Sequence, residues 1–237
     1  MIEVKEAYAR GENILQFIQD NYDPSIPRET IIEISYDLQS GTYIESYDPP
    51  WADKYTQEHA DLIQNHFPNP LSVIDIGCGE LTHTQALFNK LNSTKHFFAC
   101  DISFSRCLIG QKFYKENTPT VLFDKTKIFI AELLKLPFED NSIDVIVSSH
   151  SLEPNHGKEK EILSELLRVA KRGLVLVEPS YELSDEAQRK RMETHGYIRD
   201  IPDIITGMEN CNLIQNALLN TNKNPLNRSA SFVIEKV

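Results

Sequence analysis

Three acidic residues and two glycines in this chain are spaced so that they could hold a small polar molecule. Asp75, Gly77 and Gly79 form the pattern D-x-G-x-G at the end of an apolar run, and Asp101 and Glu132 follow later apolar runs. Glycines in a tight turn let a ligand lie directly against the backbone, because they carry no Cβ atom. A carboxylate only accepts hydrogen bonds, so it can receive hydroxyl groups of a ligand. The residue types therefore indicate a site for a bound small molecule.

The glycine pattern is not that of a dinucleotide-binding turn. The fingerprint G-x-G-x-x-G requires a glycine where this chain has Thr82. Taken singly, Asp75 and Asp101 are equally consistent with acids that cap the helices after them. Taken together, acids end three successive apolar runs, and in an open parallel sheet those ends line one crevice where ligands bind.

The pattern D-x-G-x-G, with an acid closing the next strand, resembles motif I of the class I S-adenosylmethionine (SAM) methyltransferases. Residues 131–149 (AELLKLPFEDNSIDVIVSS) are similar to the third and fourth strand region of the small-molecule enzymes of methyltransferase type 11. Residues 149–153 (SHSLE) match the segment that this family places beneath the methionine part of SAM. The resemblance covers about residues 71–180 well and the rest of the chain weakly.

The resemblance implies SAM as cofactor and S-adenosyl-L-homocysteine (SAH) as product, with no metal ion. It places Asp101 on the ribose hydroxyls, Glu132 near the adenine amino group and Leu133 against the adenine ring. The family usually has a third glycine where this chain has Leu81, which could alter how the ligand lies. The cofactor-binding residues that we expect are Gln39, Tyr43, Asp75, Gly77, Cys78, Gly79, Asp101, Ile102, Glu132, Leu133 and Ser149.

Three residues near the expected crevice are candidates for a catalytic base. His150 directly follows the fourth strand, Glu178 closes the fifth, and His195 lies on a loop that could fold over the opening. Histidine suits a base near neutral pH because its unperturbed pKa is about 6.5. The alternatives are a packing or positioning role for His150, substrate binding for Glu178 and a surface turn for His195.

The segment before the first strand is a candidate lid. In similar methyltransferases such helices cover SAM and its substrate, which implies a covering segment at residues 1–68 and a SAM-binding domain at residues 69–237. Tyr47 and Trp51 would then line the acceptor site, with Tyr181 as a further substrate contact. The plainer alternative for this segment is a helix end with exposed tyrosines.

Alternating apolar runs and helical stripes predict an α/β fold. We expect a doubly wound, Rossmann-like, seven-stranded sheet that is mostly parallel, with an antiparallel last strand and an N-terminal helical lid. The expected strands are 71–76, 96–101, 127–131, 143–149, 173–178, 212–219 and 229–237. The expected helices are a first one around Tyr8 to Ile18, then 28–39, 51–66, 82–92, 103–115, 158–170, 183–193 and 198–208, with a loop at 116–126.

Composition narrows the class of partner. The formal net charge is −11, and the one short basic run, Arg189–Arg191, is predicted to be a solvated helix face. This charge argues against nucleic acid and against an anionic membrane surface. The four cysteines show no C-x-x-C spacing, so we expect neither a zinc site nor disulfides. With no apparent signal peptide, a cytoplasmic setting is expected, as a monomer or homodimer.

The sequence thus predicts methyl transfer from SAM to an oxygen or nitrogen of a small polar metabolite. A sugar, a sugar nucleotide or a natural-product scaffold would each fit. One alternative is a protein or nucleic-acid methyltransferase, although the signature D/N-P-P-Y is missing after the fourth strand, where residues 148–151 read SSHS. The other alternative is a SAM-binding protein without catalytic activity.

Overall fold

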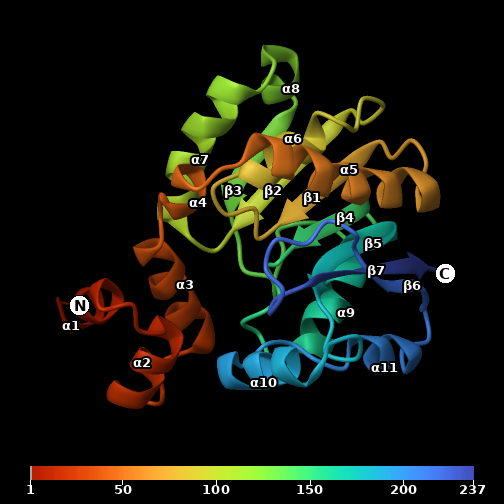
Figure 1. The fold of residues 1–237 in the computed structure, drawn as a ribbon. Coiled ribbons are helices and arrows are strands. Elements are labelled where there is room, and N and C mark those ends of the chain that lie inside the picture. The colour runs from red at the N-terminus through yellow and green to blue at the C-terminus, as the bar shows by residue number, and fades with distance from the viewer. Residues whose placement is uncertain (1) are drawn as a thin grey trace.

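A seven-stranded sheet forms the centre of the computed structural model, which describes residues 2–237 (Figure 1). The order across the sheet is β3-β2-β1-β4-β5-β7-β6. Strands β1 to β5 run parallel, and β7 runs antiparallel to both of its neighbours. The predicted fold class is therefore confirmed. The strands are β1 Ser72–Ile76, β2 His96–Asp101, β3 Thr126–Ile130, β4 Ile143–Ser149, β5 Ala170–Pro179, β6 Cys211–Leu218 and β7 Ser229–Lys236.

Helices cover both faces of the sheet (Figure 1). One face carries α5 (Pro49–His66), α6 (Thr82–Phe88) and α7 (Phe104–Asn117), whose buried apolar side chains form a single cluster with that face. The other face carries α9 (Glu159–Val169) and α11 (Ile201–Thr206), with α10 (Glu186–His195) beside them. Because the central strands are buried on both faces, they are apolar almost throughout.

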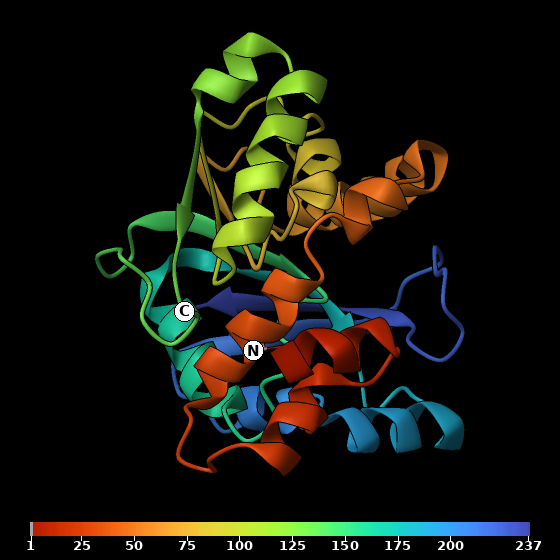
Figure 2. The ribbon, with the colours of Figure 1, turned by 90° about the vertical axis from the view of Figure 1, so that its left-hand side faces the viewer.

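The chain begins with a small helical unit that has its own apolar core. Helices α1 (Ile2–Ala9), α2 (Ile14–Asn21) and α3 (Arg28–Leu38) bury one apolar cluster that is separate from both clusters of the sheet. The short α4 (Thr42–Glu45) follows α3. Figure 2 faces this side of the molecule, where these helices lie across the front of the sheet. We call α1 to α4 the lid helices.

The structure departs from the predicted elements in a few places. The expected loop at 116–126 contains the helix α8 (Thr120–Asp124), which is too short to produce a periodic pattern and begins after Pro119. The first expected helix is two helices, because Gly11, at φ +78°, separates α1 from α2. The expected helix at 183–193 begins only at Glu186, since Asp185 forms a capping box with Gln188. None of the described helices is long and apolar enough to cross a bilayer.

Leu81, the departure from the family's glycine pattern, keeps the backbone conformation that glycine favours. It lies at φ +57° and precedes the first turn of α6. Its side chain is fully buried between α6 and α7, where a Cβ atom on Gly110 would come within 2.6 Å of Leu81 Cδ1. Leu81 does not line the large cavity at the strand ends. A leucine at this position is therefore accommodated because its side chain packs against Gly110.

Two replacements of Leu81 distinguish the contribution of its packing to stability from the cost of its left-handed backbone conformation. Leu81→Ala removes a buried side chain and should lower the free energy of unfolding by roughly 2–5 kcal/mol. Leu81→Gly loses the same contacts but relieves the left-handed conformation, so it should be more stable than Leu81→Ala by about 1 kcal/mol. Urea unfolding of both variants measures the difference. If Leu81→Ala were the more stable of the two, the strain at this turn would be refuted.

Candidate functional site

A cavity of about 840 Å³ lies between the carboxyl ends of the parallel strands and the lid helices. This volume falls in the upper part of the roughly 300–1,000 Å³ range of small-molecule sites. It is lined both by strand-end residues and by residues of α1 to α5. Of the residues singled out in the sequence, those that line it are Gln39, Tyr43, Tyr47, Trp51, Asp75, Gly77, Cys78, Gly79, Asp101, Ile102, Glu132, Leu133, Ser149, His150 and His195.

Two of the candidate residues lie elsewhere. Glu178 is fully buried and does not line the cavity. Its carboxylate accepts hydrogen bonds from the Ser148 hydroxyl (2.7 Å) and from the amides of Ser151 (3.1 Å) and Leu152 (3.3 Å). Tyr181 lies outside the cavity, and its hydroxyl donates to Glu193 at 2.6 Å. Glu178 therefore supports the loop after β4 from behind, and Tyr181 packs at the surface of α10.

The acids at the ends of β1 and β2 are buried and held by hydrogen bonds. Asp75 accepts a bond from the Thr84 hydroxyl at 2.6 Å. Asp101 accepts bonds from the amides of Gly79 and Ser103, both at 2.8 Å, which ties the glycine turn to the neighbouring strand. Burial raises the pKa of Asp101, although Arg106 opposes the rise. Both carboxylates thus reach the cavity in a fixed orientation.

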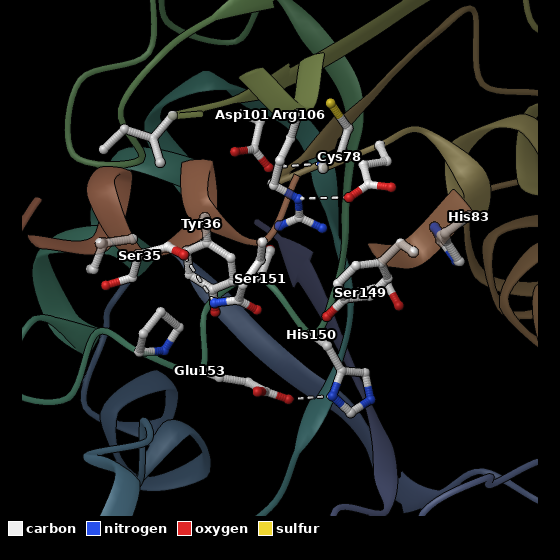
Figure 3. A pocket seen from close by; sticks show the side chains of 18 of the residues that line it. Ser35, Tyr36, Cys78, His83, Asp101, Arg106, Ser149, His150, Ser151 and Glu153 are labelled. Atoms are coloured by element: carbon white, nitrogen blue, oxygen red, sulfur yellow. Dashed lines mark hydrogen bonds and ion pairs between the residues drawn. The ribbon is translucent and has the colours of Figure 1, made fainter. Parts of the chain in front are cut away.

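Arg106 lies over the glycine turn, a position that the sequence pattern did not predict. Its guanidinium carbon is 4.6 Å from the centre of the Tyr43 ring and 5.2 Å from that of Tyr36. A Cβ atom added to Gly79 would come within 2.4 Å of the Arg106 guanidinium, which would have to move, and the φ of +52° at Gly79 also favours glycine. Figure 3 shows Arg106 beside Asp101 at one end of the cavity. The buried guanidinium compensates the negative charge gathered at this end.

The lid helices are fastened to the same turn by Glu80. This buried carboxylate accepts bonds from the amides of Gly41 (2.9 Å) and Ile44 (2.8 Å), so α4 is held at its first turn. At a second point, the Arg28 side chain donates two bonds to the carbonyl of Pro154, at 2.8 and 3.0 Å. The cavity is therefore closed by helices anchored at two of its sides.

A histidine–carboxylate pair lies at the other end of the cavity (Figure 3). His150 follows β4 at φ +52°, and its Nδ1 contacts the carboxylate of Glu153. Its Nε2 lies 2.6 Å from the Ser229 hydroxyl, which is 3.3 Å from the Tyr55 hydroxyl. The Tyr55 hydroxyl in turn lies 3.0 Å from that of Ser149. The carboxylate thus fixes the ring, and a chain of hydroxyls continues from its other nitrogen.

The charges of the pair follow from their mutual contact. Burial by itself lowers the pKa of His150, but the carboxylates of Glu153 and Glu178 outweigh it, so the pKa is raised above 6.5. Burial by itself raises the pKa of Glu153, but His150 and Asn227 outweigh it and the pKa is lowered. For Glu178, burial outweighs the charge of His150 and the hydrogen bonds from Ser148 and Ser151, and it raises the pKa to about 7. Of these three groups, His150 is therefore the one that both lines the cavity and can exchange a proton near neutral pH.

The second histidine, His195, is arranged differently. Its Nδ1 lies 2.9 Å from Nδ2 of Asn13 in α2. Since an amide nitrogen donates, this ring nitrogen accepts and Nε2 carries the proton. Burial and the charge of Arg191 lower the pKa of His195. The ring of His195, which lines the cavity, is thus neutral and has its hydrogen-bond donor at Nε2.

Unpaired polar atoms are concentrated on the cavity wall. Ten buried side-chain nitrogen and oxygen atoms among the described residues lack a hydrogen-bond partner. Six of the ten belong to residues that line the cavity: Trp51, His83, Arg106, Ser151, Arg191 and Asn227. Because buried polar groups are almost always paired, this concentration indicates a ligand-binding surface. Within residues 2–237 no group of three or more His, Cys, Asp or Glu side chains is placed to hold a metal ion.

Comparisons with known proteins agree with this geometry. Residues 73–173 match the family model described as "Methyltransferase domain". A search of the curated proteins finds no match. Two solved structures share the fold over nearly the whole chain. Magnesium protoporphyrin IX methyltransferase from Synechocystis PCC 6803 with bound SAM is 14% identical, with a TM-score of 0.65 over 91% of this chain and 100% of that chain.

The other solved structure is geranyl diphosphate C-methyltransferase from Streptomyces coelicolor A3(2), in complex with Mg²⁺, geranyl diphosphate and SAH. It is 10% identical, with a TM-score of 0.64 over 90% of this chain and 99% of that chain. At these identities the likeness shows the fold alone. The family match over residues 73–173 is independent of it and covers the glycine turn and β4.

The electrostatic account of His150 is open to a direct test. Glu153→Gln removes the carboxylate that raises the pKa of His150, so burial should dominate and the pKa should fall. NMR titration of the His150 imidazole measures this shift. Glu159→Gln is a matched control, because Glu159 also contacts a histidine three residues before it, His156 (2.7 Å), and lies outside the cavity. An unchanged His150 pKa in Glu153→Gln would contradict the account.

Proposed function

This chain carries the methyltransferase domain of the class I SAM-dependent enzymes, and we propose that it methylates an oxygen or nitrogen of a small polar molecule held under the lid helices. One observation carries the proposal. The Asp101 end and the His150–Glu153 end open into the same cavity, so a cofactor bound at the first can face an acceptor at the second.

The residues at the Asp101 end fit an adenosyl group. Asp101 would accept the ribose hydroxyls on the side that faces the cavity, and Glu132 and Leu133 would flank the adenine. The amides around Gly77 to Gly79, with Asp75, Cys78, Ile102 and Ser149, would surround the remainder of the cofactor. Gln39 and Tyr43, which also line the cavity, would cover it from the lid. Unpaired polar atoms on His83, Arg106 and Ser151 are available to the same ligand.

The acceptor would lie between the lid helices and the loop after β4. We assign residues 1–68 to the covering segment and residues 69–237 to the SAM-binding domain. Tyr47 and Trp51 would form part of the acceptor wall, and both line the cavity. Anchoring of α4 by Glu80 holds this helix at the cavity, whose volume of about 840 Å³ suits a small acceptor. Nucleic acid would need a positive surface, whereas the chain carries a net charge of −11.

His150 would act as the general base. SAM supplies a methyl group on a sulfonium, whose carbon–sulfur bond breaks as the bond to the acceptor forms, leaving SAH. The acceptor's proton passes to Nε2 of His150, directly or through the Ser229 hydroxyl 2.6 Å away. Glu153 holds the proton on Nδ1 and stabilises the imidazolium that results. General-base catalysis of this kind contributes roughly 10²–10⁴-fold, and alignment of the reactants contributes further.

The alternatives are less consistent with the site. A SAM-binding protein without activity was a possibility because of Leu81, but that side chain packs on Gly110 and leaves the cavity wall unaltered. The solved structures of similar fold act on magnesium protoporphyrin IX and geranyl diphosphate by their names, which supports a small molecule. Neither name identifies the acceptor of this chain.

Cofactor placement is tested by Asp101→Ala. Losing the charged ribose acceptor should weaken SAM binding by roughly 10- to 100-fold. Calorimetric titration with SAM measures this, with thermal unfolding as a check, because Asp101 also anchors Gly79 and Ser103. Asp124→Ala is the control, since Asp124 is exposed at the end of α8. Unchanged SAM affinity in a folded Asp101→Ala protein would exclude the assigned ribose site.

The role of His150 is tested by the pH dependence of turnover. With a raised pKa, kcat/KM should increase with pH through a group that titrates above 6.5 and then level off. His150→Gln should abolish this limb and lower kcat roughly 10²–10⁴-fold, while SAM affinity stays within about twofold. Measurement needs labelled SAM and any accepted substrate. If kcat and SAM affinity fell together by the same factor, His150 would position the ligands and would not be the base.

A further inference from the structure

Arg191 is a cation on the cavity wall that lacks a carboxylate partner. It belongs to the basic run Arg189–Arg191, which the sequence suggested was a solvated helix face. The structure divides this run. Arg189 donates to the carbonyls of Tyr181 (3.0 Å) and Glu182 (3.2 Å), and Lys190 is exposed. Arg191, by contrast, lines the cavity.

The guanidinium of Arg191 is held but not neutralised. It lies 5.6 Å from the centre of the Tyr197 ring and donates to the Tyr197 hydroxyl at 3.4 Å. Its Nε is buried without a hydrogen-bond partner. Among the described residues, no carboxylate lies within 4.0 Å of it, whereas Arg106 has one at this distance and Arg168 has two. A half-buried charge of this kind is costly unless a partner binds to it.

The other arginine of the cavity wall, Arg106, faces the carboxylates of Asp101 and Glu80, and His150 faces that of Glu153. His195 is neutral with its proton on Nε2, as its contact with Asn13 requires. Among the described residues, Arg191 is thus the cavity-lining arginine without a carboxylate within 4.0 Å. An anionic group on the ligand would give it the partner that Arg106 already has.

We propose that the acceptor carries a carboxylate and that Arg191 binds it. This inference rests on the proposed function and specifies the class of its substrate. A guanidinium presents two parallel N–H groups that match the two oxygens of a carboxylate. The neutral His195 ring beside it adds a donor.

A phosphate group fits less well. A phosphate monoester is close to a dianion at neutral pH and is normally held by several charges or by a set of backbone amides. Here the half-buried Arg191 is the single cation of this kind. The other cavity-lining cation without an acidic partner among the described residues, Lys223, is exposed and lies 5.5 Å over the Trp51 ring. The binding chemistry thus favours a singly charged acid.

The test compares acids with their neutral derivatives. Wild-type protein is incubated with labelled SAM and a panel of hydroxy and amino acids, the methyl esters and amides of the same compounds, and phosphate monoesters. The acids should receive label, and their esters and amides should be at least about tenfold poorer in kcat/KM. Equal labelling of the esters, preference for the phosphate monoesters, or no labelling of any acid would each overturn the proposal.

Variants of Arg191 show whether this residue is responsible. Arg191→Gln should raise the acceptor KM roughly 10- to 100-fold with little change in kcat, and should remove the preference for acid over ester. Arg191→Lys should restore part of both. Lys190→Gln, next to it but exposed, should match wild type.

A cofactor titration separates the possible failures. SAM affinity in Arg191→Gln should equal that of wild type. If SAM binding weakened in this variant while the acceptor KM stayed constant, Arg191 would hold the carboxylate of the cofactor itself and the inference would be wrong. If wild-type protein failed to bind SAM at all, the proposed function would fail instead.

Discussion

The buried carboxylate of Glu80 couples the two halves of this molecule. It belongs to the glycine turn after β1, yet both of its oxygens accept amide hydrogens from the lid segment, at Gly41 and Ile44. A charge withdrawn from water to this extent is tolerated only when it is fully hydrogen-bonded. The position of α4 is therefore fixed by the turn on which the cofactor site is built. The lid helices are also held by Arg28 on the Pro154 carbonyl and by Asp37 on Ser103 and Ser105 at the start of α7.

The two ends of the cavity carry different sets of charged groups. Acids at the strand ends create a negative end, and Arg106 from α7 compensates it while stacking on the lid tyrosines. At the opposite end, the loop after β4 brings His150 to Glu153, and Glu178 secures that loop from below. The sheet supplies both ends, because its parallel strands finish at one edge. The lid helices lie over this edge and form the other wall of the cavity.

Much of this arrangement could be predicted from the sequence. Apolar runs that end in acids identified the parallel strands and placed Asp75, Asp101 and Glu132 at one crevice, where all three line the cavity. Residues that arrive from distant segments could not be predicted in the same way. Arg106, Asn227 and Ser229 each lie on the cavity wall through tertiary packing alone, and their neighbours in the chain show no pattern.

Two misplaced candidates show the limits of reasoning from strand ends. Glu178 closes β5 as expected, but the alternation of side chains along the strand directs it under the loop after β4. Tyr181 was expected near the substrate, but the turn before Asp185 places it against Arg189 and Glu193. Short elements such as α4 and α8 were also missed, because four or five residues carry too little periodicity to reveal a helix.

The account's central claim is that one cavity holds the cofactor at the Asp101 end, with its sulfur directed towards His150. A crystal structure with SAH bound tests this most directly. We expect both ribose hydroxyls within hydrogen-bonding distance of the Asp101 carboxylate, and the sulfur facing the space between His150 and the lid helices. A ribose bound away from Asp101, or a sulfur directed away from His150, would contradict it.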